Sequence, residues 1–141
     1  MLSRRGMNQQ ELRERTKKFA IQSLKLCRAL PRDWDIREIG KQLLRSGTSV
    51  AANCRACGRA RSDKEFCSKI GLVVEEADES QLWLELVAVA HPPIKDGMYK
   101  DLLREAGELT AIFTASHKTA KANLQKKKEA KKRKRAAEAV R

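Results

Sequence analysis

DKEFCSKIGLVVEEADESQLWLELVAVA, residues 63–90, is the stretch that decides the fold. Apolar or small side chains recur in it at alternating spacings of four and three residues, which places them on one side of a helix: Phe66, Ile70, Val73, Ala77, Ser80, Leu84 and Val87. Ser62 and Glu65 form a capping-box pair at its start. The pattern therefore predicts a helix that buries one full seam against other helices.

The same stretch carries a second apolar strip, made of Leu72, Trp83 and Leu86, with Glu76 and Glu79 inside it. A helix of a lone bundle needs one seam. We therefore expect the second strip to be a subunit interface, in which the two glutamates pair with arginines of a neighbouring copy. The alternative is that Trp83 is a partly exposed rim residue and that the glutamates are solvated.

Three further helices are predicted from the same periodicity, over about residues 9–30, 34–61 and 98–120. Asn8 with Glu11, and Asp33, are the expected N-terminal caps, and Pro31 and the HPP at 91–93 end helices. The expected fold is all-α: an antiparallel four-helix bundle over residues 8–121 with a basic C-terminal extension, a Lys/Arg-rich tail over residues 122–141.

The predicted helix over 34–61 has two contrasting sides. One side is apolar and includes Ile36, Leu43 and Val50, with glycines 40, 47 and 58 beside it. Because glycine inside a helix costs about 1 kcal/mol relative to alanine, close packing against a neighbouring helix is expected there. The opposite side is a basic ridge, composed of Arg37, Lys41, Arg45, Arg55 and Arg59.

Positive charge is concentrated at the C-terminal end of the chain. Its 31 Lys and Arg residues outnumber 18 Asp and Glu residues, for a net charge of +13, and residues 118–141 hold 11 of the basic residues and 2 of the acids. The densest run is Lys126, Lys127, Lys128, Lys131, Lys132, Arg133, Lys134 and Arg135. This run is typical of a partner that is a polyanion, because each neutralised phosphate releases condensed counterions.

Two alternatives exist for this tail: it serves solubility alone, or it lies on anionic lipid. The second is disfavoured because the tail has no Trp, Phe or Leu face for a membrane surface. Its composition leaves open whether it is a helical extension or a disordered arm. With no signal peptide and no apolar run long enough to span a membrane, the expected location is the cytoplasm.

Neither a catalytic site nor a cofactor or metal site is expected. The acids at 75, 76, 78 and 79 spread around a helix, and neither His91 nor His117 lies in a recognisable motif. Cys54 and Cys57 form a single C-x-x-C inside a helical pattern, without the second pair that a zinc site needs. We interpret the cysteines as buried thiols of the core.

Three segments in order carry a family resemblance: GKQLLRSGTSVAA (40–52), RARSDKEFCSK (59–69) and EEADESQLWLE (75–85). Over about residues 11–86 the chain resembles the four-helix-bundle proteins encoded in intervening sequences of bacterial 23S ribosomal RNA genes. The resemblance implies a homopentameric ring, and kinship with accessory proteins of diversity-generating retroelements. It carries no catalytic residues over, and the lysine-rich tail is not part of it.

The first hypothesis for function is therefore a non-catalytic, homo-oligomeric protein that binds RNA, with the ridge and the tail contacting phosphates. No cluster of aromatic residues is available to stack bases, so little base recognition is expected. The alternative is an accessory subunit that bridges a retroelement reverse transcriptase and its template RNA.

Overall fold

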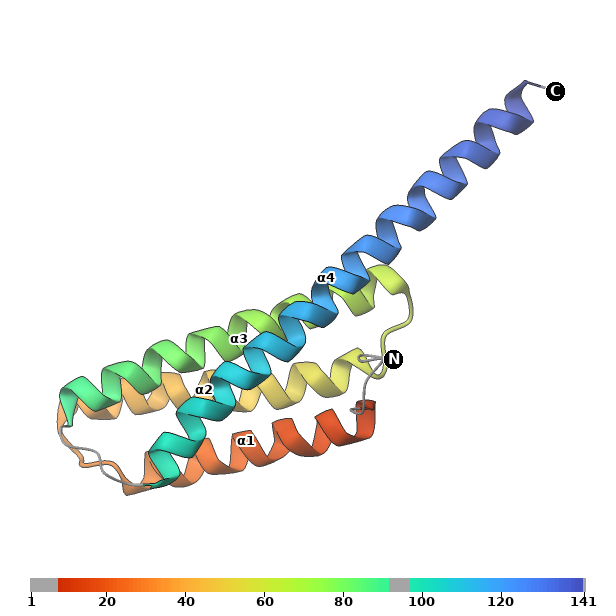
Figure 1. Ribbon diagram of the computed structural model, residues 1–141. Coiled ribbons are helices and arrows are strands. Elements are labelled where there is room, and N and C mark those ends of the chain that lie inside the picture. The colour runs from red at the N-terminus through yellow and green to blue at the C-terminus, as the bar shows by residue number, and fades with distance from the viewer. Residues whose placement is uncertain (1–7, 92–96, 141) are drawn as a thin grey trace.

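The structure, a computed structural model, describes residues 8–91 and 97–140. This part of the chain consists of four helices and no strands: α1 (Gln9–Ala29), α2 (Trp34–Cys57), α3 (Asp63–Ala90) and α4 (Gly97–Ala139). Successive helices run antiparallel, and α4 crosses the bundle and continues far beyond it (Figure 1). The prediction of an all-α four-helix bundle is confirmed.

The predicted seam of α3 lies in the core. Its residues from Ile70 to Val87 are fully buried, while Phe66 at the start of the seam is half-buried. Polar residues within the seams are satisfied by their own helices. In α1, for example, the buried Thr16 hydroxyl donates to the Leu12 carbonyl at 2.8 Å. The core therefore follows the heptad pattern even where the pattern includes Ser or Thr.

The helix starts match the predicted caps in two cases of three. Asn8 and Glu11 form a reciprocal capping box at α1. The Ser62 hydroxyl accepts from the Glu65 amide at 3.0 Å at α3, although the Glu65 carboxylate accepts from the Arg61 amide instead of completing the box. Asp33 precedes α2 but makes no capping hydrogen bond.

One predicted helix end was wrong, and one prediction is only partly covered. α2 ends at Cys57, since Gly58 and the next residues turn toward α3, and not near residue 61. The periodic part of α4 ends near residue 120, and the helix continues to Ala139, one of the two alternatives that the sequence left open, because the chain after Gly107 has good helix formers and neither Gly nor Pro. Pro92 and Pro93 lie outside the described residues.

Among the glycines of α2, Gly47 is the one that close packing requires. A Cβ placed there would lie 2.6 Å from the Ser23 Oγ and 2.9 Å from the Ser23 Cβ on α1. A Cβ at Gly40 would make only an ordinary contact, 3.5 Å from Leu30, and Gly58 lies beyond the helix. The expected close approach of a neighbouring helix is therefore confirmed, with α1 as that helix, but it depends on a single glycine.

Helices α1 and α4 pack against each other less extensively than the other neighbouring pairs. Arg15 of α1 connects them: its guanidinium donates to both carboxylate oxygens of Glu105, at 2.7 and 2.6 Å, and to Glu108 at 2.7 Å. These hydrogen bonds, led by that to Glu105, raise the pKa of Arg15 against the opposing effect of its burial.

No helix in residues 8–91 or 97–140 combines the length and the apolar character needed to cross a membrane.

Candidate nucleic-acid interface

The five residues of the predicted basic ridge are all exposed. Four of them lie on α2, whose opposite side packs Leu43 and Val50 into the core. Arg59 comes after α2 has ended, so its alignment with the others rests on the turn at Gly58 and not on helical periodicity. Phosphate contacts require accessible cations, and this surface offers them.

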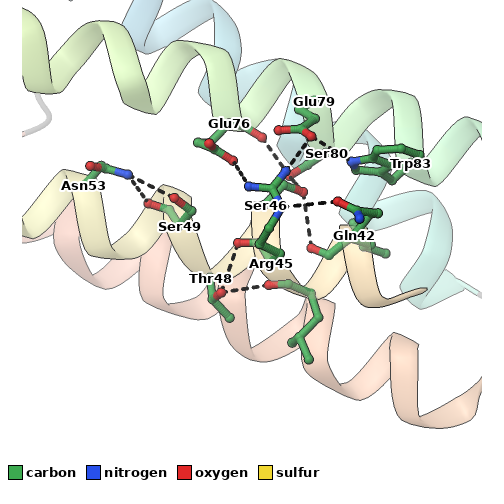
Figure 2. A network of polar contacts seen from close by, with 12 residues as sticks. Gln42, Arg45, Ser46, Thr48, Ser49, Asn53, Glu76, Glu79, Ser80 and Trp83 are labelled. Carbon is green, nitrogen blue, oxygen red and sulfur yellow. Dashed lines mark hydrogen bonds and ion pairs between the residues drawn. The ribbon is translucent and has the colours of Figure 1, made fainter. Parts of the chain in front are cut away.

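Two ridge residues are already paired: Lys41 with Glu38 of the same helix at 3.2 Å, and Arg45 with acids of α3. The Arg45 guanidinium reaches from α2 to Glu76 and Glu79 on α3, contacting Glu76 at 3.2 Å and Glu79 at closer range (Figure 2). Nearby, the buried Ser46 and Ser80 hydroxyls share a hydrogen bond of 2.8 Å. Arg45 thus links α2 to α3 and has less charge to offer a phosphate than Arg55 or Arg59.

The two glutamates respond differently to Arg45. The hydrogen bond from Arg45 is the main reason that the pKa of Glu79 lies below its usual value, and the Trp83 Nε1 also donates to this carboxylate, at 3.3 Å. Burial raises the pKa of Glu76 and outweighs the attraction of Arg45. Of the two, we regard Glu79 as the firmer ion-pair partner, because it accepts two side-chain donors.

These contacts change the interpretation of the second strip on α3. Its two glutamates were expected to pair with a neighbouring copy, but they pair with Arg45 of the same chain. Trp83 is half-buried and packs against the core of its own bundle. Of the five predicted interface residues, Leu72 and Leu86 neither form an ion pair nor pack against the core within residues 8–91 and 97–140, and Leu72 is 36% exposed.

The ridge residues other than Arg45 fall into two groups at opposite ends of α2, and each group borders a hollow with basic residues of other segments. Arg37 and Lys41 line the first hollow together with Arg28 and Arg32. The second is lined by Arg55 and Arg59 with Arg13 of α1. Sequence reasoning missed these α1 and loop arginines because a single-helix pattern does not say which neighbour a side chain will face.

The tail residues lie on the part of α4 that projects from the bundle (Figure 1). The core-facing stripe of α4 is apolar through Phe113 and still half-buried at Leu124, but the same stripe then continues with Lys127, Lys131 and Lys134. With no apolar side to bury, residues 125–140 are exposed all round. The open alternative is thus decided in favour of a helical extension.

Nothing in residues 8–91 and 97–140 groups three or more His, Cys, Asp or Glu side chains as a metal site would. Cys54, Cys57 and Cys67 are buried and Cys27 is half-buried, all as free thiols. Burial raises the pKa of Cys57 to about 12 and that of Cys27 to about 11. Thiols this weakly acidic are poor nucleophiles at neutral pH, which fits a packing role.

The sequence and the fold are both similar to those of known proteins. The family model described as "23S rRNA-intervening sequence protein" matches residues 8–115. A crystal structure from Bacteroides thetaiotaomicron, described as a protein with unknown function from the S23 ribosomal protein family, is similar with a TM-score of 0.70 and 28% identity, over 79% of this chain and 99% of that one. No curated protein matches the sequence. The family match ends before the exposed extension of α4.

Proposed function

This chain belongs to the 23S rRNA-intervening sequence protein family, and we propose that it binds RNA through the exposed cations of α2 and of the α4 extension, without catalysing a reaction. The observation that carries the proposal is the extension itself. It presents eight Lys and Arg side chains between residues 126 and 135, all exposed. Within the described chain, only Lys127 of these forms an ion pair, with Asp63.

Repulsion among its positive charges destabilises the helical extension unless a partner of opposite charge is bound. Like charges at i and i+4 destabilise a helix, and Lys127 with Lys131, and Lys128 with Lys132, are two such pairs. Phosphates placed along the extension would relieve this repulsion and release counterions. The family's description refers to intervening sequences of 23S rRNA, which associates the protein with an RNA gene and names no ligand, and we take RNA as the polyanion on this association.

The expected mode of binding is to the backbone and not to the bases. Trp34 is exposed, but it lies at the start of α2, and the large buried aromatic residues, Phe19 and Phe113, belong to the core. A lone exposed ring is no stacking platform for successive bases. Binding should therefore tolerate many sequences while depending strongly on salt.

The test is a titration of labelled RNA with the full-length protein at several salt concentrations. With about six phosphates neutralised on a single strand, the logarithm of the affinity should fall with the logarithm of salt at a slope of about −4. A loop-rich RNA and an unrelated RNA of equal length should bind alike. An affinity that stays flat between low and physiological salt would refute the proposal.

We also propose that the copies assemble into a homo-oligomeric ring, five by the family resemblance. The support lies on the outer side of α3, where Leu82 is 47% and Val89 is 75% exposed. The exposed acids Glu75, Asp78 and Glu85 lie on the same helix, so this side complements the exposed lysines of α1, Lys17, Lys18 and Lys25, on another copy and leaves the ridge of α2 free for RNA. Native mass spectrometry should report a multimer, and a monomer at micromolar concentration would contradict this part of the proposal.

A further inference from the structure

We infer that Arg55, Arg59 and the α4 extension, which the sequence presents as separate basic regions, form one continuous groove for a single nucleic-acid backbone. This groove, called the end groove below, crosses the end of the bundle where α1 begins, α2 ends and α3 begins. The inference rests on the RNA binding proposed above and names the part of the surface that carries it.

The end groove is built from three hollows that share lining residues. The first lies between α1 and α2 and is bordered by Arg13, Arg55 and Arg59. It shares Gln9 and Gly58 with the second hollow, which passes over the turn between α2 and α3.

The second hollow includes Arg61 and shares Asp63 and Phe66 with the third. The third is bordered on its other side by Lys126 and Lys127 of α4. A chain of phosphates can therefore pass from the α1–α2 arginines to the base of the extension without leaving a depression in the surface. Figure 1 shows that the extension leaves the bundle at this same end.

The charges that face the end groove are mostly positive. Arg13, Arg55 and Arg59 have no carboxylate within ion-pair distance in the described chain, whereas Arg61 pairs with Glu65 at 3.6 Å. Asp63 pairs with Lys127 at the point where the groove meets α4. Glu65 and Asp63 therefore reduce the positive charge of the groove. Asp63 lies between its two basic parts, because it lines both the second and the third hollow.

The other basic hollow does not join this path. It lies at the opposite end of α2, around Arg37 and Lys41, and shares no lining residue with the three hollows of the end groove. α2 rises about 1.5 Å per residue, so Arg37 and Arg55 are separated by roughly 27 Å along it, far beyond the screening length of about 8 Å at physiological salt. The two ends of α2 should therefore contribute independently.

The first experiment compares charge removal at the two ends of α2 in the full-length chain. The double variant Arg55→Gln with Arg59→Gln should weaken RNA binding about tenfold and reduce the salt slope by about 1.4, about 0.7 for each phosphate that is no longer neutralised. The control, Arg37→Gln with Lys41→Gln, removes the same net charge near the other end of α2, where Lys41 already pairs with Glu38 at 3.2 Å, and should weaken binding much less. Circular dichroism melts establish that both variants remain folded.

A gain-of-binding variant makes the test independent of folding losses. Asp63→Asn removes the acid between the two basic parts and frees Lys127, so RNA affinity should rise about threefold or more at physiological salt. Asp101→Asn changes the net charge equally, but at the start of α4 among the residues that face α1. With screening over about 8 Å, this control should leave the affinity nearly unchanged.

The outcomes separate the inference from the proposed function. If the wild-type protein binds RNA, but both double variants weaken binding equally or Asp63→Asn matches Asp101→Asn, the end groove is refuted while RNA binding stands. If the wild-type protein does not bind RNA at all, both proposals fail together.

Discussion

Arg45 and Arg55 occupy the same side of α2, yet their surroundings differ. Arg45 is held between Glu76 and Glu79 of α3, and these contacts raise its pKa, with the Glu79 hydrogen bond contributing most. Arg55 is exposed beside Arg13 and Arg59. The periodicity of the sequence placed both on one ridge correctly, but it could not show that α3 brings acids to one of them. At the scale of the residue, the neighbouring helix decides that Arg45 is paired within the fold while Arg55 stays exposed, and only the second is proposed to bind RNA.

Replacing Arg45 with Gln should therefore affect stability more than RNA affinity. Both side chains of the Arg45–Glu79 pair are partly exposed, so the loss should be about 0.5–1 kcal/mol. The pKa of folded Glu79 lies below its usual value of 4.5, so the pair stabilises the fold above about pH 4.5. That contribution disappears as the pH falls through the lowered pKa.

Urea unfolding of wild type and variant at pH 7 and pH 3 provides the check. The difference in unfolding free energy should shrink at pH 3, and a difference that grows on acidification would contradict the assignment. At pH 7 the RNA affinity of the variant should stay closer to wild type than that of Arg55→Gln.

Gly47 gives a second prediction at the residue scale. Gly47→Ala places a methyl group against Ser23, which should cost about 1–3 kcal/mol of overpacking, against about 1 kcal/mol gained in helix propensity. We expect a net loss of up to about 2 kcal/mol in the free energy of unfolding. Gly40→Ala is the matched control, because its Cβ meets only an ordinary contact. It should be neutral or stabilising, and equal losses at both sites would show that Gly47 has no special role.

At the scale of the element, the α4 extension is a helix that continues beyond the packed bundle. The end of a helix is set by local propensity when no packing is at stake, and residues 125–139 contain only good helix formers. The sequence predicted the end of the apolar stripe correctly, but the end of the stripe is not the end of the helix. At α2 the prediction was wrong, because the pattern extended past Cys57 although the chain had already turned.

Removing residues 126–141 should weaken RNA binding and leave the stability of the bundle nearly unchanged. The extension buries nothing, and its ion pair with Asp63 is exposed, so the melting temperature should change by no more than a few degrees. RNA affinity should fall at least tenfold and the salt slope should become shallower. A second variant with Gln at residues 131–135 keeps the length but not the charge. If this variant retains wild-type affinity, the charge of the extension is not what binds RNA.

At the scale of the whole molecule, charge of opposite sign is distributed over different sides. α3 has seven acids and two basic residues, while α1 has two acids and six basic residues. Such polarity suits both proposals, since the basic sides can bind RNA while the acidic side of α3 meets another copy. The sequence predicted the basic ridge, the fold and the tail from periodicity and composition. It could not predict the end groove, because the hollows that Arg13, Arg61 and Lys126 line become neighbours only after four helices have packed.

The central claim is that RNA lies on the basic surface, and photo-crosslinking of full-length protein to RNA, followed by peptide mass spectrometry, tests it most directly. We predict crosslinked peptides from residues 9–13, 55–61 and 126–135, all of which weaken as salt rises. Crosslinks concentrated on the outer side of α3, over residues 75–89, would contradict it.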